Sequence, residues 1–502
     1  MSTKVPGPKG RVSSGLLLPT ASPIPLSAVA AEAGAEVRGD AGVSVADATY
    51  AAAEVRTGSL FFCVPGARAD GHDFAAVALG GGAVALVVER WLDLDAPQLL
   101  VGSVRAAMGP MSALVFGRPS DAMTMIGITG TNGKTTTTYL MESVLRAAGC
   151  VPGVIGTTGA RIDGEPVALK RTTPEAPDLH RLLAEMRDRG VDAVAMEVSS
   201  HALEQHRVGG VRFECALFTN LSQDHLDYHP SMEEYFAAKA LLFTPAYAER
   251  GVVNADDAWA VRLRDATIPV TTYGLAVDAD VRGTHATATA DGVSFVVAGR
   301  TVRSPLRGMF NVENCLGALA ASRALGIDDD VAIAGIEALD GVPGRVEPVD
   351  EGQRFLVMVD YAHTPDSIDN VLRATRPLAA GRVIVVFGCG GDRDRGKRPL
   401  MGRAATSRAD LTVVTSDNPR SEDPLAIIAE IEPGAREGGG AYVIEPDRRA
   451  AIRLAVREAR TGDVVVIAGK GHESGQEFAD RTIPFDDRQV AAEELRALGA
   501  NR

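Results

Sequence analysis

Short apolar runs alternate with longer segments of helical periodicity through the last third of the chain. The apolar runs predict strands at residues 355–359, 383–387, 411–415 and 464–468. The segments beside them predict helices at residues 366–377, 398–408, 424–432 and 447–459. Such alternation indicates a parallel sheet with helices on both faces, whose ligands bind at the carboxyl ends of the strands. We therefore expect a C-terminal Rossmann-like domain.

The rest of the chain divides into two further regions. The first is rich in Ala, Gly and Val, with strands predicted at residues 60–64 and 83–88. The second has strands predicted at residues 191–198, 215–219 and 251–254, and a Pro- and Gly-rich stretch at 343–348 indicates a linker. The predicted fold class is α/β with three domains, which we place at residues 1–121, 122–345 and 346–502.

A glycine-rich turn opens the middle region. The segment from Gly127 to Thr136, GITGTNGKTT, follows an apolar strand and begins a helix. Glycines let backbone N–H groups turn toward phosphate oxygens, and the helix N-terminus adds a positive end. Lys134 is expected to reach the β- and γ-phosphates and Thr135 to bind Mg²⁺. The spacing GxxGxxGKT departs from the usual GxxxxGK[ST], and the alternative is an ordinary turn. We favour a central ATPase domain of the P-loop type.

Two polar residues at strand ends are candidate metal ligands. Glu197 ends the apolar strand in VAMEVSSHAL, and His225 follows another strand in TNLSQDHLDYH. Mg²⁺ takes hard ligands, chiefly carboxylates, waters and phosphate oxygens. A glutamate at a strand end is often only a capping or solvated residue. Two such positions beside a phosphate loop favour a functional interpretation.

Lys239 is predicted to lie in the middle of an apolar helix face. Helical spacing places Tyr235 and Leu242 on one side of it and Phe236 and Phe243 on the other. The alternative is a lysine whose stem follows the helix to solvent. Desolvation lowers the pKa of a lysine, and the resulting neutral amine can react with CO₂ to form an anionic carbamate able to hold Mg²⁺.

Charge and cysteine content exclude some classes of function. The formal net charge of −14 argues against a nucleic-acid partner, which would require a basic surface. The five cysteines are scattered without a CxxC pair, as expected for reduced thiols in a cytoplasmic protein. We expect no signal peptide and no membrane span, because no apolar run reaches about 18 residues.

A series of motifs in fixed order resembles one known family. These are GTNGKTT, MEVSSHALEQHRV, TNLSQDHLDYH with YFAAKALLF, FNVENCLGALA, GVPGRVE, DYAHTPDS, FGCGGDRDRGKRPLM, SDNPR and GKGHE. They resemble the Mur ligases, strongly over residues 123–490 and weakly before them. The resemblance implies an enzyme that uses ATP to activate a carboxylate as an acyl phosphate and captures it with an amine. The three domains then bind the UDP-linked substrate, ATP and an amino acid.

The resemblance also implies roles for individual residues on the nucleotide side. The ATP-binding residues are Gly130, Thr131, Asn132, Gly133, Lys134, Thr135, Thr136, Asn311, Arg345, Asp360, Tyr361 and His363. Two Mg²⁺ ions are held by Thr135, Glu197, His225 and a carbamate on Lys239. Asn311 contacts the adenine side of ATP. Lys134, Glu197, His225 and Lys239 together form the implied catalytic set.

A second group is implied for the donor, a UDP-N-acetylmuramoyl dipeptide. It comprises Ala67, Arg68, Ala69, Thr172, Thr173, Ser199, Gln205 and Arg207. Two positions depart from the family pattern. Ala51–Ala53 occupy the place of a serine near the uridine site, and Arg171 stands where an asparagine is often found.

The third group is implied for the acceptor, meso-diaminopimelate. It comprises Arg393, Asp417, Asn418, Pro419, Arg420, Gly469 and Glu473. The chemistry agrees, because Arg393 and Arg420 suit the distal carboxylate. Asp417 and Glu473 suit the distal ammonium. L-Lysine lacks that carboxylate and would leave a buried arginine unpaired. Taken alone, SDNPR is also typical of a turn.

The expected reaction adds meso-diaminopimelate to the γ-carboxylate of D-Glu in UDP-N-acetylmuramoyl-L-Ala-D-Glu, in peptidoglycan precursor synthesis. We expect a monomer, with a hinge at residues 343–348. The alternatives within the ligases are addition of L-lysine, addition of D-Ala-D-Ala, and folylpolyglutamate synthesis. From other classes, a P-loop ATPase without ligase activity remains open. A Rossmann dehydrogenase is disfavoured, since the loop lacks GxGxxG.

Overall fold

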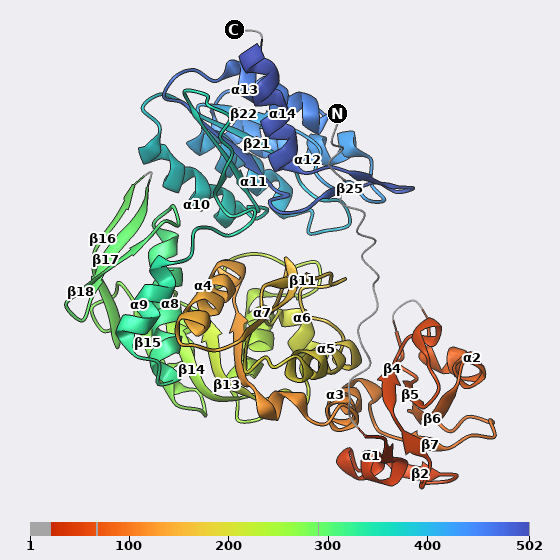
Figure 1. The fold of residues 1–502 in the computed structure, drawn as a ribbon. Helices are drawn as coiled ribbons and strands as arrows, with labels where there is room; N and C mark the ends of the chain where they lie inside the picture. Colours follow the sequence, from red (N-terminus) through yellow and green to blue (C-terminus); the bar gives the residue numbers. More distant parts are fainter. Residues whose placement is uncertain (1–21, 67–68, 290, 501–502) are drawn as a thin grey trace, which may run out of the picture. The chain divides into compact units, whose positions relative to one another are not determined.

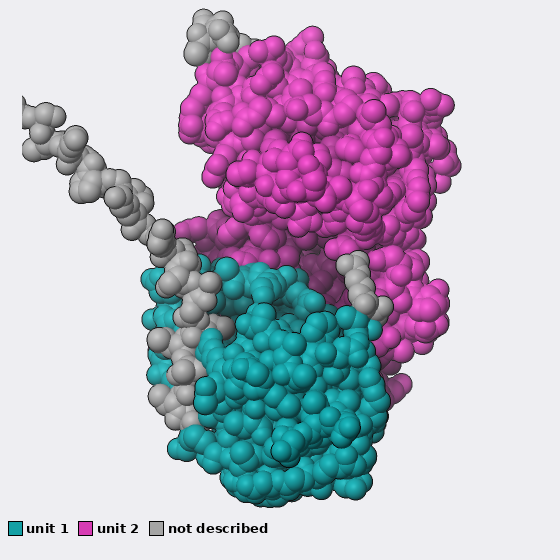
Figure 2. Space-filling view, turned by 90° about the vertical axis from the view of Figure 1, so that its right-hand side faces the viewer, with its two compact units in different colours: residues 1–123, 159–192, 205–211 teal, residues 124–158, 193–204, 212–502 magenta. Residues whose placement is uncertain are grey.

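The computed structural model describes residues 22–66, 69–289 and 291–500. The chain forms two compact units, coloured separately in Figure 2. The first comprises residues 1–123, 159–192 and 205–211. The second comprises residues 124–158, 193–204 and 212–502.

The first unit is built on one mixed sheet with helices on both faces (Figure 1). Its strand order is β2-β7-β6-β5-β4, in which only β2 pairs antiparallel. Helices α1 and α3 pack on one face and α2 on the other. The elements are β1 (Ile24–Pro25), α1 (Leu26–Glu32), β2 (Glu36–Arg38), β3 (Ser44–Val45), β4 (Asp47–Thr49), β5 (Ser59–Phe62), α2 (Ala75–Gly80), β6 (Ala83–Val88), β7 (Gln98–Leu100), α3 (Val104–Val115), β10 (Gly159–Ile162), β11 (Glu165–Val167) and α5 (Ala176–Asp188).

The second unit begins with a sheet in the order β9-β12-β8-β13-β14-β15-β16-β17-β18. Its first strands are parallel, and β16 to β18 form an antiparallel extension. Helices α4, α8 and α9 share one core with this sheet. The elements are β8 (Thr124–Thr129), α4 (Lys134–Ala147), β9 (Pro152–Gly156), β12 (Ala193–Glu197), α6 (Ser200–Glu204), β13 (Phe213–Phe218), α7 (Met232–Ala240), β14 (Ala248–Asn254), β15 (Val270–Gly274), β16 (Val281–Thr289), β17 (Gly292–Val297), β18 (Arg300–Ser304), α8 (Phe310–Ala324) and α9 (Asp329–Glu337).

The second unit ends with another sheet, in the order β19-β20-β24-β21-β22-β23. All its pairs are parallel except β19 with β20. Helices α10, α11 and α12 cover one face, and α13 and α14 cover the other. The elements are β19 (Glu347–Pro348), β20 (Leu356–Asp360), α10 (Pro365–Thr375), β21 (Val383–Phe387), α11 (Lys397–Arg408), β22 (Leu411–Val414), α12 (Pro424–Gly438), β23 (Tyr442–Ile444), α13 (Arg448–Glu458), β24 (Val464–Ala468), β25 (Gly475–Glu477), β26 (Thr482–Pro484) and α14 (Asp487–Ala500).

The α/β fold class expected from the sequence is confirmed. The strands predicted at 83–88, 383–387 and 464–468 agree to the residue. The helix predicted at 424–432 is wrong at its end, because α12 continues through Pro433 to Gly438. Strand β23 was missed, since three residues at a sheet edge carry too little pattern. The domain boundaries at residues 121 and 345 stay a prediction.

Close packing of α12 on α11 accounts for the longer helix. A Cβ atom on Gly434 would lie 1.7 Å from the Pro399 carbonyl oxygen. The two backbones therefore approach too closely for any side chain at that position. The Thr406 hydroxyl of α11 also donates to the Ala435 carbonyl oxygen at 2.9 Å. Packing against α11 thus stabilises the helical turn of α12 that contains Pro433.

We expect Gly434→Ala to lower the free energy of unfolding by about 2 kcal/mol, because overpacking forces the helices apart. The measurement is the thermal midpoint, which should fall by several degrees. Gly499→Ala, also in a helix but with nothing within 4 Å of the added methyl, is the matched control. It should leave the midpoint unchanged or raise it slightly. Equal midpoints in the two variants would contradict the packing argument.

Among the residues that the structure describes, no helix is both long enough and apolar enough to cross a bilayer.

Candidate active site

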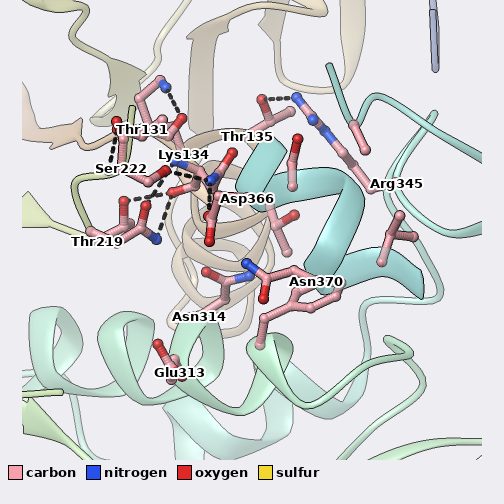
Figure 3. Close-up of a pocket in the computed structure, with 18 of the residues that line it drawn as sticks. Thr131, Lys134, Thr135, Thr219, Ser222, Glu313, Asn314, Arg345, Asp366 and Asn370 are labelled. Atoms are coloured by element: carbon pink, nitrogen blue, oxygen red, sulfur yellow. Dashed lines mark hydrogen bonds between the residues drawn. The ribbon is translucent and has the colours of Figure 1, made fainter. Parts of the chain in front are cut away.

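A cavity of about 570 Å³ lies in the second unit, at the carboxyl ends of the central strands. The loop after β8 forms one wall, and residues of α8 and α10 form others (Figure 3). Lys134 and Thr135 come from the start of α4, Asn314 from α8, and Asp366 from α10. The position agrees with the expectation that ligands bind where parallel strands end.

The loop between β8 and α4 requires its glycines. Gly130 and Gly133 have φ angles of 141° and 84°, which side chains rarely adopt. A Cβ on Gly130 would lie 2.0 Å from the Thr219 hydroxyl, and one on Gly133 would lie 2.4 Å from Oδ1 of Asn314. The loop is therefore packed against β13 and α8 without space for side chains. This shape therefore requires glycine at both positions.

Two lysines converge on this loop. Lys134 donates from Nζ to the carbonyl oxygens of Gly130 and Thr131, at 3.0 and 2.9 Å. Lys239 donates from Nζ to the same Gly130 carbonyl at 2.8 Å. Burial lowers the pKa of Lys134, and burial together with the Lys134 charge lowers the pKa of Lys239 well below its usual value. The Lys134 amine and the N-terminus of α4 both lie at this loop, an arrangement suited to phosphate.

Lys239 is buried, as the spacing predicted. Its relative exposure is 2%, and Tyr235, Phe236, Leu242 and Phe243 are buried with it. The Nζ atom lies 4.7 Å from the centroid of the Tyr235 ring. The alternative of a stem that reaches solvent is therefore wrong.

Glu197 ends β12 in a buried position facing the loop. Its carboxylate accepts hydrogen bonds from the Thr135 hydroxyl and from both the backbone N–H and the hydroxyl of Thr157, each at 2.9 Å. The Thr135 hydroxyl in turn accepts from the Arg345 guanidinium at 2.9 Å. Glu197 is thus not a solvated strand end. It is held beside the residue that starts the phosphate helix.

His225 belongs to a cluster of rings around Tyr235. Its ring centroid lies 5.0 Å from that of His201 and 6.1 Å from that of Tyr235. The Tyr235 hydroxyl lies 3.2 Å from the Thr131 hydroxyl of the phosphate loop. Burial lowers the pKa of His225, which favours the neutral imidazole that can bind a metal. His201 was not singled out from the sequence.

The donor set suits a divalent cation bound together with phosphate. The Thr135 hydroxyl and the Glu197 carboxylate are hard oxygen donors 2.9 Å apart beside the phosphate loop. Within the described parts of the chain, no three His, Cys, Asp or Glu side chains form a metal cluster. Phosphate oxygens and water would complete the ligand set, as is usual for Mg²⁺.

The residues expected to close over ATP line the same cavity. These are Arg345, Asp360, Tyr361 and His363. The Arg345 guanidinium lies 4.6 Å from the centroid of the Tyr361 ring. The Asp360 carboxylate accepts from the backbone N–H groups of Val346 and Ala362, each at 2.8 Å. The linker and the last sheet are thereby tied together at the cavity.

On the α8 side of the cavity, the structure places Asn314 on the wall and Asn311 behind it. Asn314 donates to Oδ1 of Asn311 at 2.8 Å, and Asn311 donates to the Arg307 carbonyl at 2.7 Å. Of the two, only Asn314 lines the cavity. Sequence reasoning singled out Asn311 alone, although both belong to the motif FNVEN.

Three further side chains at this site were not predicted. Asp366 accepts from Nδ2 of Asn132 at 2.9 Å, which joins α10 to the phosphate loop. Asp224 is buried and lies 3.4 Å from the Lys397 ammonium and 3.7 Å from Nε2 of His363. In the sequence, only their positions inside the motifs quoted above could have indicated that Asp366, Asp224 and Lys397 belong to the site.

The loops after β22 and β24 bring most of the expected acceptor residues together. The Glu473 carboxylate accepts from Nδ2 of Asn418 at 2.8 Å. Lys470, which was missed, is fully buried and donates to both of these side chains, at 2.8 Å to Asn418 and 3.0 Å to Glu473. A Cβ on Gly469 would lie 2.3 Å from the Asp417 carboxylate. Hydrogen bonds between polar side chains thus join these two loops.

The two arginines of that group lie on different loops, Arg420 farther along the loop after β22 and Arg393 on the loop after β21. Arg420 donates to the Glu477 carboxylate at 2.9 Å and to the Gly391 carbonyl at 2.8 Å. Its φ angle of 52° is in the left-handed region. Arg393 donates to the Asp392 carbonyl at 3.2 Å. Gly390 lies between them, its added Cβ 3.0 Å from Arg420 and 3.7 Å from Arg393.

The donor group divides between the two units. In the first unit, Arg207 donates to Gln205 at 2.6 Å and to the Thr173 carbonyl at 3.4 Å. A buried carboxylate that was missed, Glu175, lies 3.1 Å from Nε of Arg207. Thr172 directly precedes Thr173 in the first unit, and Ser199 belongs to the second unit.

The remaining donor predictions concern the first unit. Ala69 is exposed, and its carbonyl accepts from the Gly66 N–H at 3.0 Å. Ala67 and Arg68 lie outside the described residues. Arg171, the departure from the family pattern, donates to Glu175 at 2.8 Å.

Comparison with known proteins gives matches over most of the chain. Residues 128–322 match the Mur ligase middle domain, and residues 344–471 match the domain described as Mur ligase, glutamate ligase domain. A UDP-N-acetylmuramoyl-L-alanyl-D-glutamate–2,6-diaminopimelate ligase from Solibacter usitatus is 49% identical over 460 residues, covering 90% of this chain and 93% of the relative. A ligase of the same name from Streptomyces coelicolor is 48% identical over 475 residues, covering 91% and 94%.

A solved structure agrees. It is of a UDP-N-acetylmuramoyl-L-alanyl-D-glutamate–2,6-diaminopimelate ligase, with a TM-score of 0.68 and 34% identity, covering 95% of this chain and all of the other. The phosphate loop, the order of the motifs and these matches lead to one conclusion. The chain belongs to the Mur ligase family of ATP-dependent amide-bond ligases.

Proposed function

We propose that this protein joins meso-diaminopimelate to the γ-carboxylate of D-Glu in UDP-N-acetylmuramoyl-L-Ala-D-Glu, a step of peptidoglycan precursor synthesis. The observation that carries this proposal is the near-full-length identity of 46–49% to relatives named for that reaction. The two-sided charge of the acceptor loops supports it, because arginines and carboxylates lie within one group of loops.

The first half-reaction is phosphoryl transfer from ATP. An oxygen of the donor γ-carboxylate attacks the γ-phosphorus, the bond to the β,γ-bridging oxygen breaks, and ADP leaves with that electron pair. Lys134 and the N-terminal amides of α4 hold the phosphates in line. The Arg345 guanidinium also lies at the start of α4, where it donates to the Thr135 hydroxyl. These residues act by position and charge, and no protein group needs to transfer a proton.

The second half-reaction forms the amide. The neutral amine of the acceptor attacks the acyl carbon, and phosphate leaves from the tetrahedral intermediate with the electron pair of the C–O bond, as the nitrogen loses a proton to water. The acceptor loops hold the distal end of the amino acid, so that its reacting amine is presented at a fixed distance. Closure of the cavity keeps water from the acyl phosphate. A hinge at residues 343–348 is part of this proposal.

The metal site belongs to the same proposal. Thr135, Glu197, His225 and a carbamate on Lys239 would hold two Mg²⁺ ions. When bound, these ions neutralise charge on the transferring phosphoryl group. The burial and lowered pKa of Lys239 support the carbamate, since only a neutral amine reacts with CO₂.

Asn311 is proposed to serve the adenine side of ATP, together with Asn314, which donates to it and lines the cavity. The scattered cysteines without a CxxC pair support a cytoplasmic protein, which we propose to be a monomer.

An amino-acid panel tests the proposed reaction. With ATP and the UDP-dipeptide present, ADP release should depend on meso-diaminopimelate. The kcat/KM for L-lysine should be lower by on the order of 10²-fold or more, because L-lysine lacks the distal carboxylate that Arg393 and Arg420 are proposed to bind. ADP release should also require the dipeptide. Equal use of L-lysine or D-Ala-D-Ala would assign another ligase activity, and ADP release without an acceptor would indicate a simple ATPase.

A further inference from the structure

Arg448, the first residue of α13, forms a fully buried ion pair with Asp487, the first residue of α14. Both side chains have no exposed surface. The guanidinium donates from Nε to Oδ1 at 2.8 Å and from Nη2 to Oδ2 at 2.6 Å, a two-pronged contact. Buried ion pairs of this kind are costly to desolvate and are weak evidence for stability alone. The role of this pair is therefore inferred from the other hydrogen bonds of Arg448.

The remaining donors of Arg448 reach two strand ends. Nη1 donates to the Ser416 carbonyl at 3.2 Å, and Nη2 donates to the Ala468 carbonyl at 3.0 Å. Ser416 follows β22 and Ala468 ends β24. These strands are not neighbours, because β21 lies between them in the sheet. One guanidinium thus spans the carboxyl ends of two strands on either side of a third.

The chain beyond each of these carbonyls belongs to the acceptor loops. Asp417 follows Ser416 directly, and Gly469 follows Ala468 directly. The Asp417 carboxylate and Gly469 are in contact, with no space for a Cβ between them. Asn418 is joined to Lys470 and Glu473 farther along the same two loops. Arg448 thus joins the bases of two loops that also contact each other directly.

We propose that Arg448, oriented by Asp487, is a positioning residue for the acceptor, which fixes the spacing of the Asp417 and Gly469 loops so that they fit the distal end of the diamino acid. Arg448 itself does not touch the acceptor. This inference rests on the proposed function. It adds a residue that determines acceptor binding without contacting the acceptor.

The test compares Arg448→Lys and Asp487→Asn with the parent enzyme. A lysine has one charged nitrogen and cannot span a carboxylate and two separate carbonyls. Asparagine keeps the size of Asp487 but removes its charge. We expect the KM for meso-diaminopimelate to rise at least about tenfold in both variants. The KM values for ATP and for the UDP-dipeptide should stay within about twofold of the parent.

Arg382 and Asp463 provide a matched control. They form an arginine–aspartate pair of the same sheet, at 3.1 Å, but at the amino ends of β21 and β24. Arg382→Lys and Asp463→Asn should lower the thermal midpoint without changing the KM for the acceptor. A merely structural role for Arg448 predicts the same behaviour in both pairs.

Three results would overturn the inference. These are an unchanged acceptor KM in Asp487→Asn, an equal rise in all three KM values, and the same acceptor defect in the control variants. Asp487→Asn decides the matter if Arg448→Lys does not fold. Failure of the proposed function is recognised separately, because the parent enzyme would then show no ADP release that depends on meso-diaminopimelate.

Discussion

Lys134→Ala is expected to reduce ADP release by about 10²- to 10³-fold at saturating substrates. The Lys134 Nζ atom is held at the start of α4 by the carbonyls of Gly130 and Thr131, in the loop proposed to bind the phosphates. A group that is aligned beforehand stabilises developing charge without reorganisation. Steady-state ADP release with both substrates present measures the effect.

The fold should tolerate this substitution. Burial lowers the pKa of Lys134, which means that the charged form is disfavoured where it stands. Removing the ammonium should therefore leave the thermal midpoint unchanged or raise it. Lys134→Arg serves as the second variant, because it keeps the charge but presents a planar group to a loop shaped for an ammonium. Parent-like turnover in Lys134→Ala would contradict the assignment of this loop to phosphate.

Lys239→Ala is expected to abolish measurable turnover, with a loss on the order of 10²-fold or more if its carbamate holds a cation beside the phosphates. The lowered pKa raises the neutral fraction of the amine near neutral pH, and the neutral amine is the form that reacts with CO₂. The alanine variant leaves space where a small carboxylate can enter. Added bicarbonate, formate or acetate should therefore restore part of the activity.

The controls for Lys239 separate chemistry from packing. Lys239→Met keeps the apolar stem and its contact with Tyr235 but has no amine and leaves no cavity. It should fold, stay inactive and resist rescue by carboxylates. Mass spectrometry of the parent enzyme under CO₂ should show the added 44 Da, a mass fixed by the carbamate formula. Failure of every carboxylate to restore Lys239→Ala would argue against the carbamate, and full activity of Lys239→Met would exclude a role for the amine.

Local sequence was sufficient for the phosphate loop and for the buried lysine. The strand, the glycines and GKTT are consecutive, so their geometry depends little on distant residues. The apolar spacing around Lys239 likewise lies within α7 and the turn after it. Strands buried on both faces, such as β21 and β24, are continuous apolar runs and were therefore easy to recognise.

Residues whose importance comes from a distant partner could not be found in this way. Asp224 matters because Lys397 and His363 lie near it, and these are more than a hundred positions away along the chain. Glu175 is one carboxylate among many until Arg105, Arg171 and Arg207 surround it. The end of α12 was mispredicted for the same reason, since packing against α11 overrides the proline.

The sequence by itself determined the class of fold, the strand–loop–helix at the glycine-rich segment and the family, because each depends on short segments whose pattern is read in order along the chain. Only the tertiary structure decided that Asn314 stands in front of Asn311, that Lys470 joins Asn418 to Glu473, and that Arg448 spans two strand ends. Those contacts depend on which carbonyls and carboxylates the folded sheet brings within hydrogen-bond distance. Spacing along the chain does not specify that.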